Sequence, residues 1–305
     1  MDRHEVSPLT PALAHRLPPS LQRVLTQANS YWLGRLVLGT MVSTRRLELF
    51  DRSMAIAAQM FTSVLPLLIA LASWVGFSSA DVADVMVTPP EARMVVEDTL
   101  ATTSSSATFG VLGILVVIVS ATSLSRALAR ACAAEWELER PRYNLSSAWR
   151  WVAAILAVLV ALLAAKPLYQ VSLNIPPPNL WETVVGLLPD VAVALAVPSL
   201  LLARAVPVRL LLPGALLYGA VMLLVRPVSA SYLPDALQAS ADRYGSLGVA
   251  FTYLTWLYVV AFCFLLSGVV GTVIVRDSGR LGTWIRGKHP WPGAATESYL
   301  PPNVS

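Results

Sequence analysis

Residues 244–275 read YGSLGVAFTYLTWLYVVAFCFLLSGVVGTVIV, and this stretch decides the class of fold. Between Leu247 and Val275 it contains no Asp, Glu, Lys or Arg. An α-helix needs about 20 mostly apolar residues to cross the roughly 30 Å of hydrocarbon in a bilayer. The stretch therefore predicts a membrane-spanning helix over residues 247–275.

Five further apolar segments are bounded by charge or proline in the same way, and they cover residues 53–75, 109–128, 149–168, 181–203 and 208–228. The composition agrees with a membrane protein, because 56% of the residues are hydrophobic and only 13% are charged. A soluble chain carries about twice that share of charge. We therefore predict an all-α integral membrane protein built as a bundle of six transmembrane helices.

The chain divides into three parts on this interpretation. Residues 31–280 form the membrane domain. Residues 1–30 and 281–305 are rich in proline and are expected to be disordered tails on the cytoplasmic side. No basic-then-apolar leader with a small-residue cleavage site precedes the first span, so we expect no signal peptide.

The distribution of basic residues predicts the orientation of the bundle, because cytoplasmic loops are enriched in Lys and Arg. Of the 22 basic residues, 18 fall on the side that carries both termini and 4 on the other side. The four exceptions are Arg93, Lys166, Arg226 and Arg243. We therefore expect a multi-pass protein of a bacterial plasma membrane with cytoplasmic termini, and these scattered basic residues do not indicate nucleic acid binding.

Two segments outside the spans have helical patterns. In residues 31–50, apolar residues recur at helical spacing beside arginines, which favours a helix lying on the inner membrane surface or packed on the ends of the spans. Residues 76–108 are acidic, and Pro89-Pro90 precedes a helix-like run, so we expect a short external helix or a solvated acidic loop.

Asp190 is the most conspicuous polar residue within a span. A carboxylate at the bilayer centre costs roughly 3 kcal/mol if it faces lipid, so Asp190 must face the bundle or a cavity. Arg226 and Lys166 are its expected partners, since both lie near the outer ends of spans. Two interpretations stay open: a proton relay or substrate-headgroup site, and a structural ion pair or helix cap.

Gln59 and Tyr218 are the next polar residues inside spans, and they join Asp190, Arg226 and Lys166 in the predicted substrate pathway. Interhelical hydrogen bonds explain Gln59 and Tyr218 equally well without transport. Three spans are interrupted by proline, at Pro66, Pro198 and Pro213-Gly214. Broken helices of this kind occur at transporter sites, but proline is also tolerated in ordinary spans.

The sequence offers no catalytic site. The three histidines lie in the tails, and no metalloprotease, nucleotide-binding or serine-hydrolase motif is present. Glu135, Glu137 and Glu139 alternate along the chain, and we interpret them as a solvated face and not as a metal cluster. Cys132 in a cytoplasmic loop and Cys263 inside a span are expected to be unpaired. We therefore expect no enzyme activity, no metal and no cofactor.

Three segments resemble the YihY/BrkB family of bacterial inner-membrane proteins. They are FDRSMAIAAQMFTSVLPLLIALASWVG at residues 50–76, SLSRALARACAAEWELER at residues 123–140, and the stretch from Tyr244 quoted above. The most specific piece is the glycine-rich entry to the last span, formed by Tyr244, Gly245, Ser246, Leu247 and Gly248. The overlapping cluster of Asp242, Arg243, Tyr244 and Gly245 is interpreted as a cap and turn that positions the helix.

The resemblance implies a six-span membrane protein with a role in transport or in the handling of envelope lipids. A ribonuclease label is also attached to the family, but RNA cleavage needs an acid–base pair or metal-bound water, and these residues supply neither. We expect a membrane transporter or lipid translocator, with a non-catalytic membrane scaffold as the alternative. Membrane lipids are the expected partners, and a homo-oligomer is left open.

Overall fold

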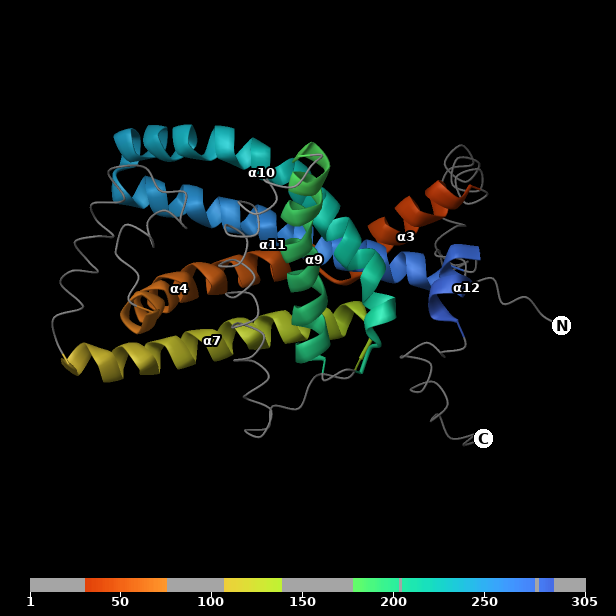
Figure 1. The fold of residues 1–305 in the computed structure, drawn as a ribbon, viewed down its shortest axis with the longest axis horizontal. Coiled ribbons are helices and arrows are strands. Elements are labelled where there is room, and N and C mark those ends of the chain that lie inside the picture. Colours follow the sequence, from red (N-terminus) through yellow and green to blue (C-terminus); the bar gives the residue numbers. More distant parts are fainter. Residues whose placement is uncertain (1–30, 76–106, 139–177, 203–204, 278–279, 288–305) are drawn as a thin grey trace, which may run out of the picture.

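The computed structural model describes residues 31–75, 107–138, 178–202, 205–277 and 280–287. Within these ranges every regular element is a helix. In chain order the helices are α3 (Trp32–Arg46), α4 (Leu49–Val75), α7 (Ala107–Glu135), α9 (Pro178–Leu201), α10 (Val208–Tyr244), α11 (Ser246–Arg276) and α12 (Arg280–Arg286). Figure 1 shows α4, α7, α11 and the end of α10 running in roughly one direction, with α9 crossing them steeply.

Five of the predicted spans fall wholly or mostly within these helices, and residues 208–228 form the first part of α10. Residues 53–75 lie in α4 and residues 109–128 in α7, whereas residues 247–275 lie in α11 and most of 181–203 in α9. The predicted third span, 149–168, and the external segment 76–108 lie outside the described residues.

The helix that contains the predicted fifth span, residues 208–228, is longer than that span, because α10 continues to Tyr244. The polar residues after Pro227 suggested an external loop. Leu233 and Leu237, one helical turn apart, are nevertheless 5% and 1% exposed, so a buried apolar face continues along the helix. Pro213, Pro227 and Pro234 lie inside α10, and prolines of this kind explain the bent course of the helix in Figure 1.

A one-residue turn joins α10 to α11. Gly245 adopts a φ of 62°, a conformation that residues with a Cβ atom rarely adopt, and its N–H donates to the Ala241 carbonyl at 2.8 Å. A Cβ atom at Gly248 would collide with the backbone carbonyl of Ser240. Two glycines of the YGSLG stretch thus fold the chain back on itself.

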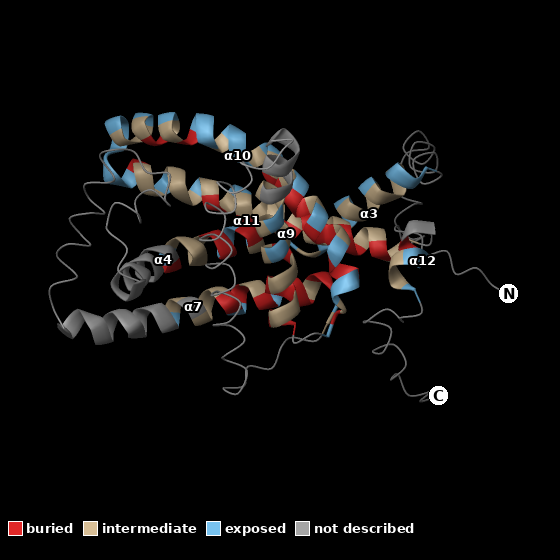
Figure 2. Cartoon of the chain, viewed as in Figure 1, coloured by how far each residue is buried: buried red, intermediate tan, exposed pale blue. Residues whose placement is uncertain are grey.

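The core lies where the helices meet away from this hairpin. Helix α11 packs on α10 and α4, α4 also packs on α7, and α9 packs chiefly on α10. Figure 2 shows the buried residues gathered along α7, α9, α10 and α11 in this region, whereas the far half of α10 is largely exposed. Near the crossing of α10 and α11, a Cβ atom at Gly271 would lie 2.6 Å from the Gly214 backbone, so the two helices touch through their main chains.

Two of the described helices, α10 and α11, are long and apolar enough to cross a bilayer. Residues 186–201 of α9 form a shorter apolar helix. The structure therefore confirms the all-helical class and membrane-type helices, whereas the six-span count stays a prediction.

Helix α3 occupies the predicted amphipathic segment, but it ends at Arg46 and a break at Leu47 and Glu48 separates it from α4. It contacts α11, and Arg35 pairs with Asp277 at 3.2 Å, yet none of its own residues is buried. Its apolar residues Leu33, Val37 and Met41 are more than half exposed. The helix therefore docks on the end of a span by one edge and leaves an apolar face open.

Helix α12, Arg280–Arg286, lies in the segment that we expected to be a loose tail. It packs on α11, and the guanidinium of Arg286 donates to the carbonyl oxygens of Arg276 and Asp277. These bonds occupy main-chain acceptors at the end of α11, and they explain why the chain stays helical after the span.

Candidate functional site

Asp190 and Arg226 form an ion pair between α9 and α10. Arg226 Nη2 donates to Asp190 Oδ1 at 2.7 Å. The Asp190 side chain is 13% exposed and the Arg226 side chain 43%, so the carboxylate lies inside the bundle and the guanidinium reaches its surface. The second carboxylate oxygen of Asp190 is buried and has no hydrogen-bond partner among the described residues.

Arg226 thus meets Asp190 as the sequence led us to expect. The other expected partner, Lys166, lies outside the described residues. Asp190 follows Pro189 inside α9, and Arg226 precedes Pro227 inside α10. Each proline lacks a backbone N–H, so one main-chain carbonyl in the preceding turn of its helix receives no helical hydrogen bond. These free carbonyls lie near the ion pair.

Tyr218 lies on α10 about two turns from Arg226 and is 7% exposed. Its ring packs edge-on against Phe264 of α11, with ring centroids 5.5 Å apart. The charges of Asp190 and Arg226 both act on the Tyr218 side chain. Tyr218 therefore lies in the bundle close to the ion pair.

Gln59 belongs to a different part of the bundle. Its Oε1 accepts a hydrogen bond from the Ser123 hydroxyl at 2.6 Å, which links α4 to α7. Ser63 strengthens the same contact by donating to the Ser120 carbonyl at 3.2 Å. The structure thus gives Gln59 an interhelical hydrogen bond and does not bring it to Asp190.

Glu135 is the residue that the sequence interpretation missed. We expected a solvated face, but α7 continues as a helix to Glu135 and carries it into the bundle, where it is 7% exposed. Its Oε1 atom is buried and accepts no hydrogen bond from the described part of the chain. Burial raises the pKa of this carboxyl well above its usual value, and the charge of Arg52 opposes the shift.

Glycines on α11 make room for this carboxyl. A Cβ atom at Gly268 would lie 2.6 Å from Glu135 Oε2, so any other residue there would collide with the carboxyl group. The helix before Glu135 is built from small residues, and Ala127, Ala131 and Cys132 are all buried. Small residues on both helices allow their close approach. The burial of Glu135 could have been predicted from the run of small residues that ends in this acid, together with Gly268 and Gly271 on the helix that packs near it.

A small cavity of about 20 Å³ connects Glu135 with the predicted pathway. Glu135, Tyr218, Phe264 and Gly268 are among its lining residues. A space of about 10–15 Å³ on this measure holds one water molecule. The cavity therefore has room for one water between the phenol and the buried carboxyl.

Glu137 shows what the expected solvated position looks like. It accepts hydrogen bonds from Arg46 at 2.6 Å and Arg276 at 3.2 Å, and it joins the end of α7 to α3 and α11. Glu139 lies outside the described residues. The three glutamates are thus not equivalent, because the helix ends between Glu135 and Glu137 and points them in different directions.

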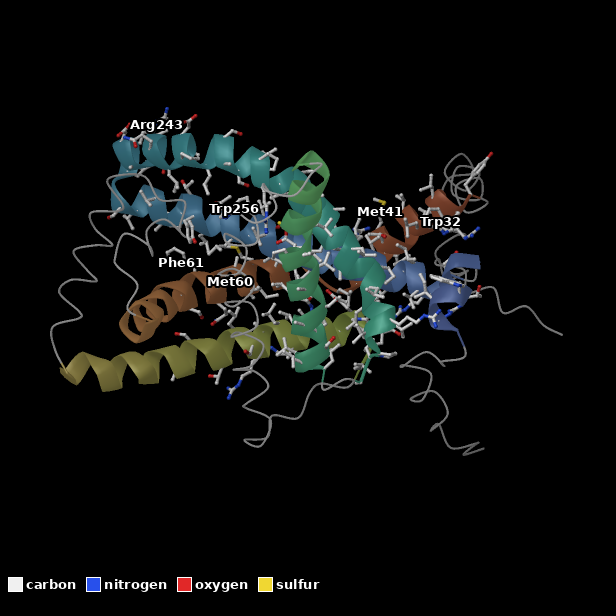
Figure 3. The ribbon with its side chains drawn as sticks, viewed as in Figure 1. Trp32, Met41, Met60, Phe61, Arg243 and Trp256 are labelled. Carbon is white, nitrogen blue, oxygen red and sulfur yellow. The ribbon has the colours of Figure 1, made fainter. Side chains whose placement is uncertain are left out.

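The bundle can therefore hold charge at two places, the Asp190–Arg226 pair and Glu135, with Tyr218 between them. The five residues 244–248 lie at the α10–α11 hairpin, and Figure 3 shows the neighbouring Arg243 at the end of the bundle away from Trp32 and Met41 on α3. Their role in the described structure is to form the turn.

The family model described as Virulence factor BrkB matches residues 41–283. The chain belongs to this family. The match to the BrkB model includes every helix from α4 to α11, and therefore both charged positions, and it agrees with the resemblance seen in the sequence. Neither the curated proteins nor the solved structures contain a significant match to the chain.

Proposed function

We propose that this BrkB-family protein is a membrane transporter or lipid translocator with six spans, the third being residues 149–168. On this proposal it is a multi-pass protein of the bacterial plasma membrane with both termini in the cytoplasm. It binds membrane lipids and catalyses no covalent reaction, ribonucleolysis included.

The observation that carries the proposal is the placement of the Asp190–Arg226 pair, Tyr218 and Glu135 on facing surfaces of α9, α10 and α7. Ionisable groups within apolar helices are expensive, and they mark ion and substrate pathways in transporters. Asp190 faces the bundle and Arg226 reaches its surface, so the pair can open toward an anionic group without exposing the carboxylate to lipid.

Each group has a distinct role on this proposal. Arg226 releases Asp190 and binds an anionic headgroup in its place. Helices α9 and α10, which prolines interrupt, bend to move the headgroup across the membrane. Glu135 takes up and releases a proton, since burial raises its pKa and the small cavity gives room for a water molecule beside it. The sequence holds no nucleotide-binding motif, so transport draws on an ion gradient, on a partner protein or on no energy source.

The test is to reconstitute the purified protein in liposomes of bacterial lipid extract and to measure labelled-phospholipid movement between the leaflets. We expect movement with the wild type and loss of movement with Asp190→Asn and with Glu135→Gln. Asp242→Asn is the matched control, because Asp242 is an exposed carboxylate near the end of α10 and should behave like the wild type.

Equal movement in the wild type and both variants would remove these residues from the pathway. Absence of movement in the wild type itself, with either phospholipid or a panel of anionic solutes, would contradict the transport proposal. Insertion and fold of each variant are checked by size-exclusion chromatography in detergent, so that an unfolded variant is not mistaken for an inactive one.

The alternative is a membrane scaffold, and one observation favours it. Gly214 and Gly271 bring α10 and α11 into main-chain contact, and the cavity beside Glu135 holds only one water, so the described part of the bundle contains no continuous polar groove there. A scaffold predicts that Asp190→Asn is tolerated. It also predicts loss of function when the arginines 45, 46, 140 and 142 are neutralised together.

A further inference from the structure

A second cavity lies between α4 and α7, and Glu135 does not line it. Its volume is about 440 Å³, which is within the range of small-molecule binding sites. The cavity is lined from α7 by Ala127, Arg130 and Ala134, which are three and four residues apart and therefore lie on one face of the helix. It is lined from α4 by Arg52 and Ala55. The small alanine side chains on both helices leave the space open.

Two arginine side chains provide all the formal charge of this lining. Arg52 is held in place, because its Nε donates to the Leu47 carbonyl at 2.6 Å and its Nη1 lies 3.4 Å from the Arg130 carbonyl. Both acceptors are main-chain oxygens. The remaining N–H groups of the Arg52 guanidinium are available to a ligand, since Arg has five donors in a planar fork.

Arg52 and Arg130 differ from the other arginines near them. Arg35 pairs with Asp277, and Arg46 and Arg276 both pair with Glu137. Neither Arg52 nor Arg130 forms a salt bridge to a carboxylate in the described ranges. The acids Glu48 and Asp51 lie nearby on the chain but do not line the cavity. The cavity therefore presents two positive charges with no carboxylate among its own lining residues. The charge of Arg52 also acts on the buried carboxyl of Glu135, which does not line the cavity.

The position of the cavity indicates the kind of anion. It opens beside the end of the bundle where α3 and α4 meet, which the distribution of basic residues places on the cytoplasmic side. Apolar Ile56 and Leu138 line it together with the arginines. A ligand with a charged head and an apolar body matches such a lining, and basic pockets between helices at the cytoplasmic surface bind anionic lipid headgroups.

We infer that the cavity between α4 and α7 is a binding site for the phosphate headgroup of an anionic phospholipid, held by Arg52 and Arg130. The guanidinium forks donate hydrogen bonds to the phosphate oxygens, and the apolar lining contacts the glycerol and the first part of the acyl chains. The site is separate from the Asp190–Arg226 pair, and its occupation does not require that the protein transports anything.

The test uses the full chain in nanodiscs of phosphatidylcholine with a minor share of phosphatidylglycerol. The protein is extracted gently, and the retained lipids are quantified by native mass spectrometry. We expect the wild type to retain phosphatidylglycerol about tenfold in excess of its share in the nanodisc. The double variant Arg52→Gln/Arg130→Gln should lose this enrichment, and Arg52→Lys/Arg130→Lys should keep part of it.

Two further variants separate binding from folding and from general charge. Ala134→Leu fills the cavity and keeps both arginines, and it should also lose the enrichment. Arg45→Gln removes an exposed arginine at the end of α3 that does not line the cavity, and it should behave like the wild type. An enrichment that survives both Arg52→Gln/Arg130→Gln and Ala134→Leu would overturn the assignment.

A final arm distinguishes a lipid headgroup from a free anion. Inorganic phosphate is added to the wild type in nanodiscs of phosphatidylcholine alone, and later to nanodiscs that contain phosphatidylglycerol. We expect millimolar phosphate not to displace the retained lipid. Displacement by phosphate, with binding of phosphate in the absence of anionic lipid, would assign the site to a soluble anion and overturn the proposal. The result does not depend on leaflet movement, so it stands or fails separately from the transport proposal.

Discussion

Glu135 shows how one side chain gives the bundle a response to pH. Its carboxyl has a raised pKa because burial disfavours the charged form, so the folded protein keeps the proton at pH values where the unfolded chain has lost it. The stability that this proton contributes is fully present below the unfolded pKa, close to 4.5, and is lost as pH rises through the folded value.

We therefore predict that the thermal midpoint of the wild type in detergent falls between pH 5 and the raised pKa of Glu135. Glu135→Gln carries no ionisable carboxyl, and its midpoint should depend less steeply on pH. The measurement is a set of thermal melts at several pH values for both proteins. Parallel pH profiles would show that Glu135 is already solvated in the native state.

Gly268 should be intolerant of a methyl group, because its Cβ position lies 2.6 Å from the Glu135 carboxyl. Gly268→Ala is expected to cost about 1–3 kcal/mol of stability, as overpacked cores do. Gly186→Ala is the matched control, since nothing lies within 4 Å of its Cβ position on α9. That change should be neutral or stabilising by up to about 1 kcal/mol, the difference in helix propensity between Gly and Ala. Chemical denaturation of both variants distinguishes the two sites.

Sequence reasoning at this scale found the Asp190–Arg226 pair because a charge inside an apolar run stands out. It missed Glu135, because the spacing of Glu135, Glu137 and Glu139 was considered alone and the end of α7 was placed too early. A helix end depends on what packs against it. The burial of the alanine-rich stretch before Glu135 is visible only when α11 lies beside it.

At the scale of elements, the α10–α11 hairpin depends on two glycines for different reasons. Gly245 has a φ of 62° and a ψ of −144°, a region that glycine almost alone adopts, so a side chain there costs on the order of 1–3 kcal/mol. Gly248 is buried against the Ser240 carbonyl, a main-chain atom that cannot move aside cheaply.

We predict that Gly248→Ala lowers the thermal midpoint more than Gly245→Ala does. The backbone collision at Gly248 must shift one helix, whereas the strain at Gly245 stays local to the turn. Leu247→Ala, an exposed neighbour in the same turn, serves as control and should change the midpoint little. A larger effect at Gly245 than at Gly248 would contradict this picture of the hairpin.

The positions of the helices were largely predictable from hydrophobic runs, since α4, α7, α9 and α11 each contain a predicted span. The length of α10 was not, because polar residues after Pro227 resemble a loop and only the burial of Leu233 and Leu237 shows that the helix continues. The helical nature of residues 280–286 was missed for the same reason. This segment of seven residues is too short to carry a periodic signal, and its packing on α11 is visible only in the structure.

At the scale of the whole molecule, membership of the BrkB family and two membrane-length helices describe a membrane protein, and its bundle encloses the carboxyl groups of Glu135 and Asp190. The six-span topology predicts that Arg243, at the α10–α11 hairpin, is on the opposite side of the membrane from Trp32 on α3. Cysteines at these two positions, in a variant without Cys132 and Cys263, should react with a membrane-impermeant maleimide from opposite sides of intact cells and inverted vesicles. Labelling of both from one side would contradict the topology.

On the transport proposal, the Asp190–Arg226 pair belongs to a transport pathway and is not merely structural. The most direct measurement compares labelled-phospholipid movement in liposomes that contain the wild type or the variant Asp190→Asn/Arg226→Gln, which keeps the shape and a hydrogen bond of the pair but removes both charges. The transport proposal predicts a folded double variant that moves no lipid. Movement at the wild-type rate would contradict it and would leave the pair as a structural link between α9 and α10.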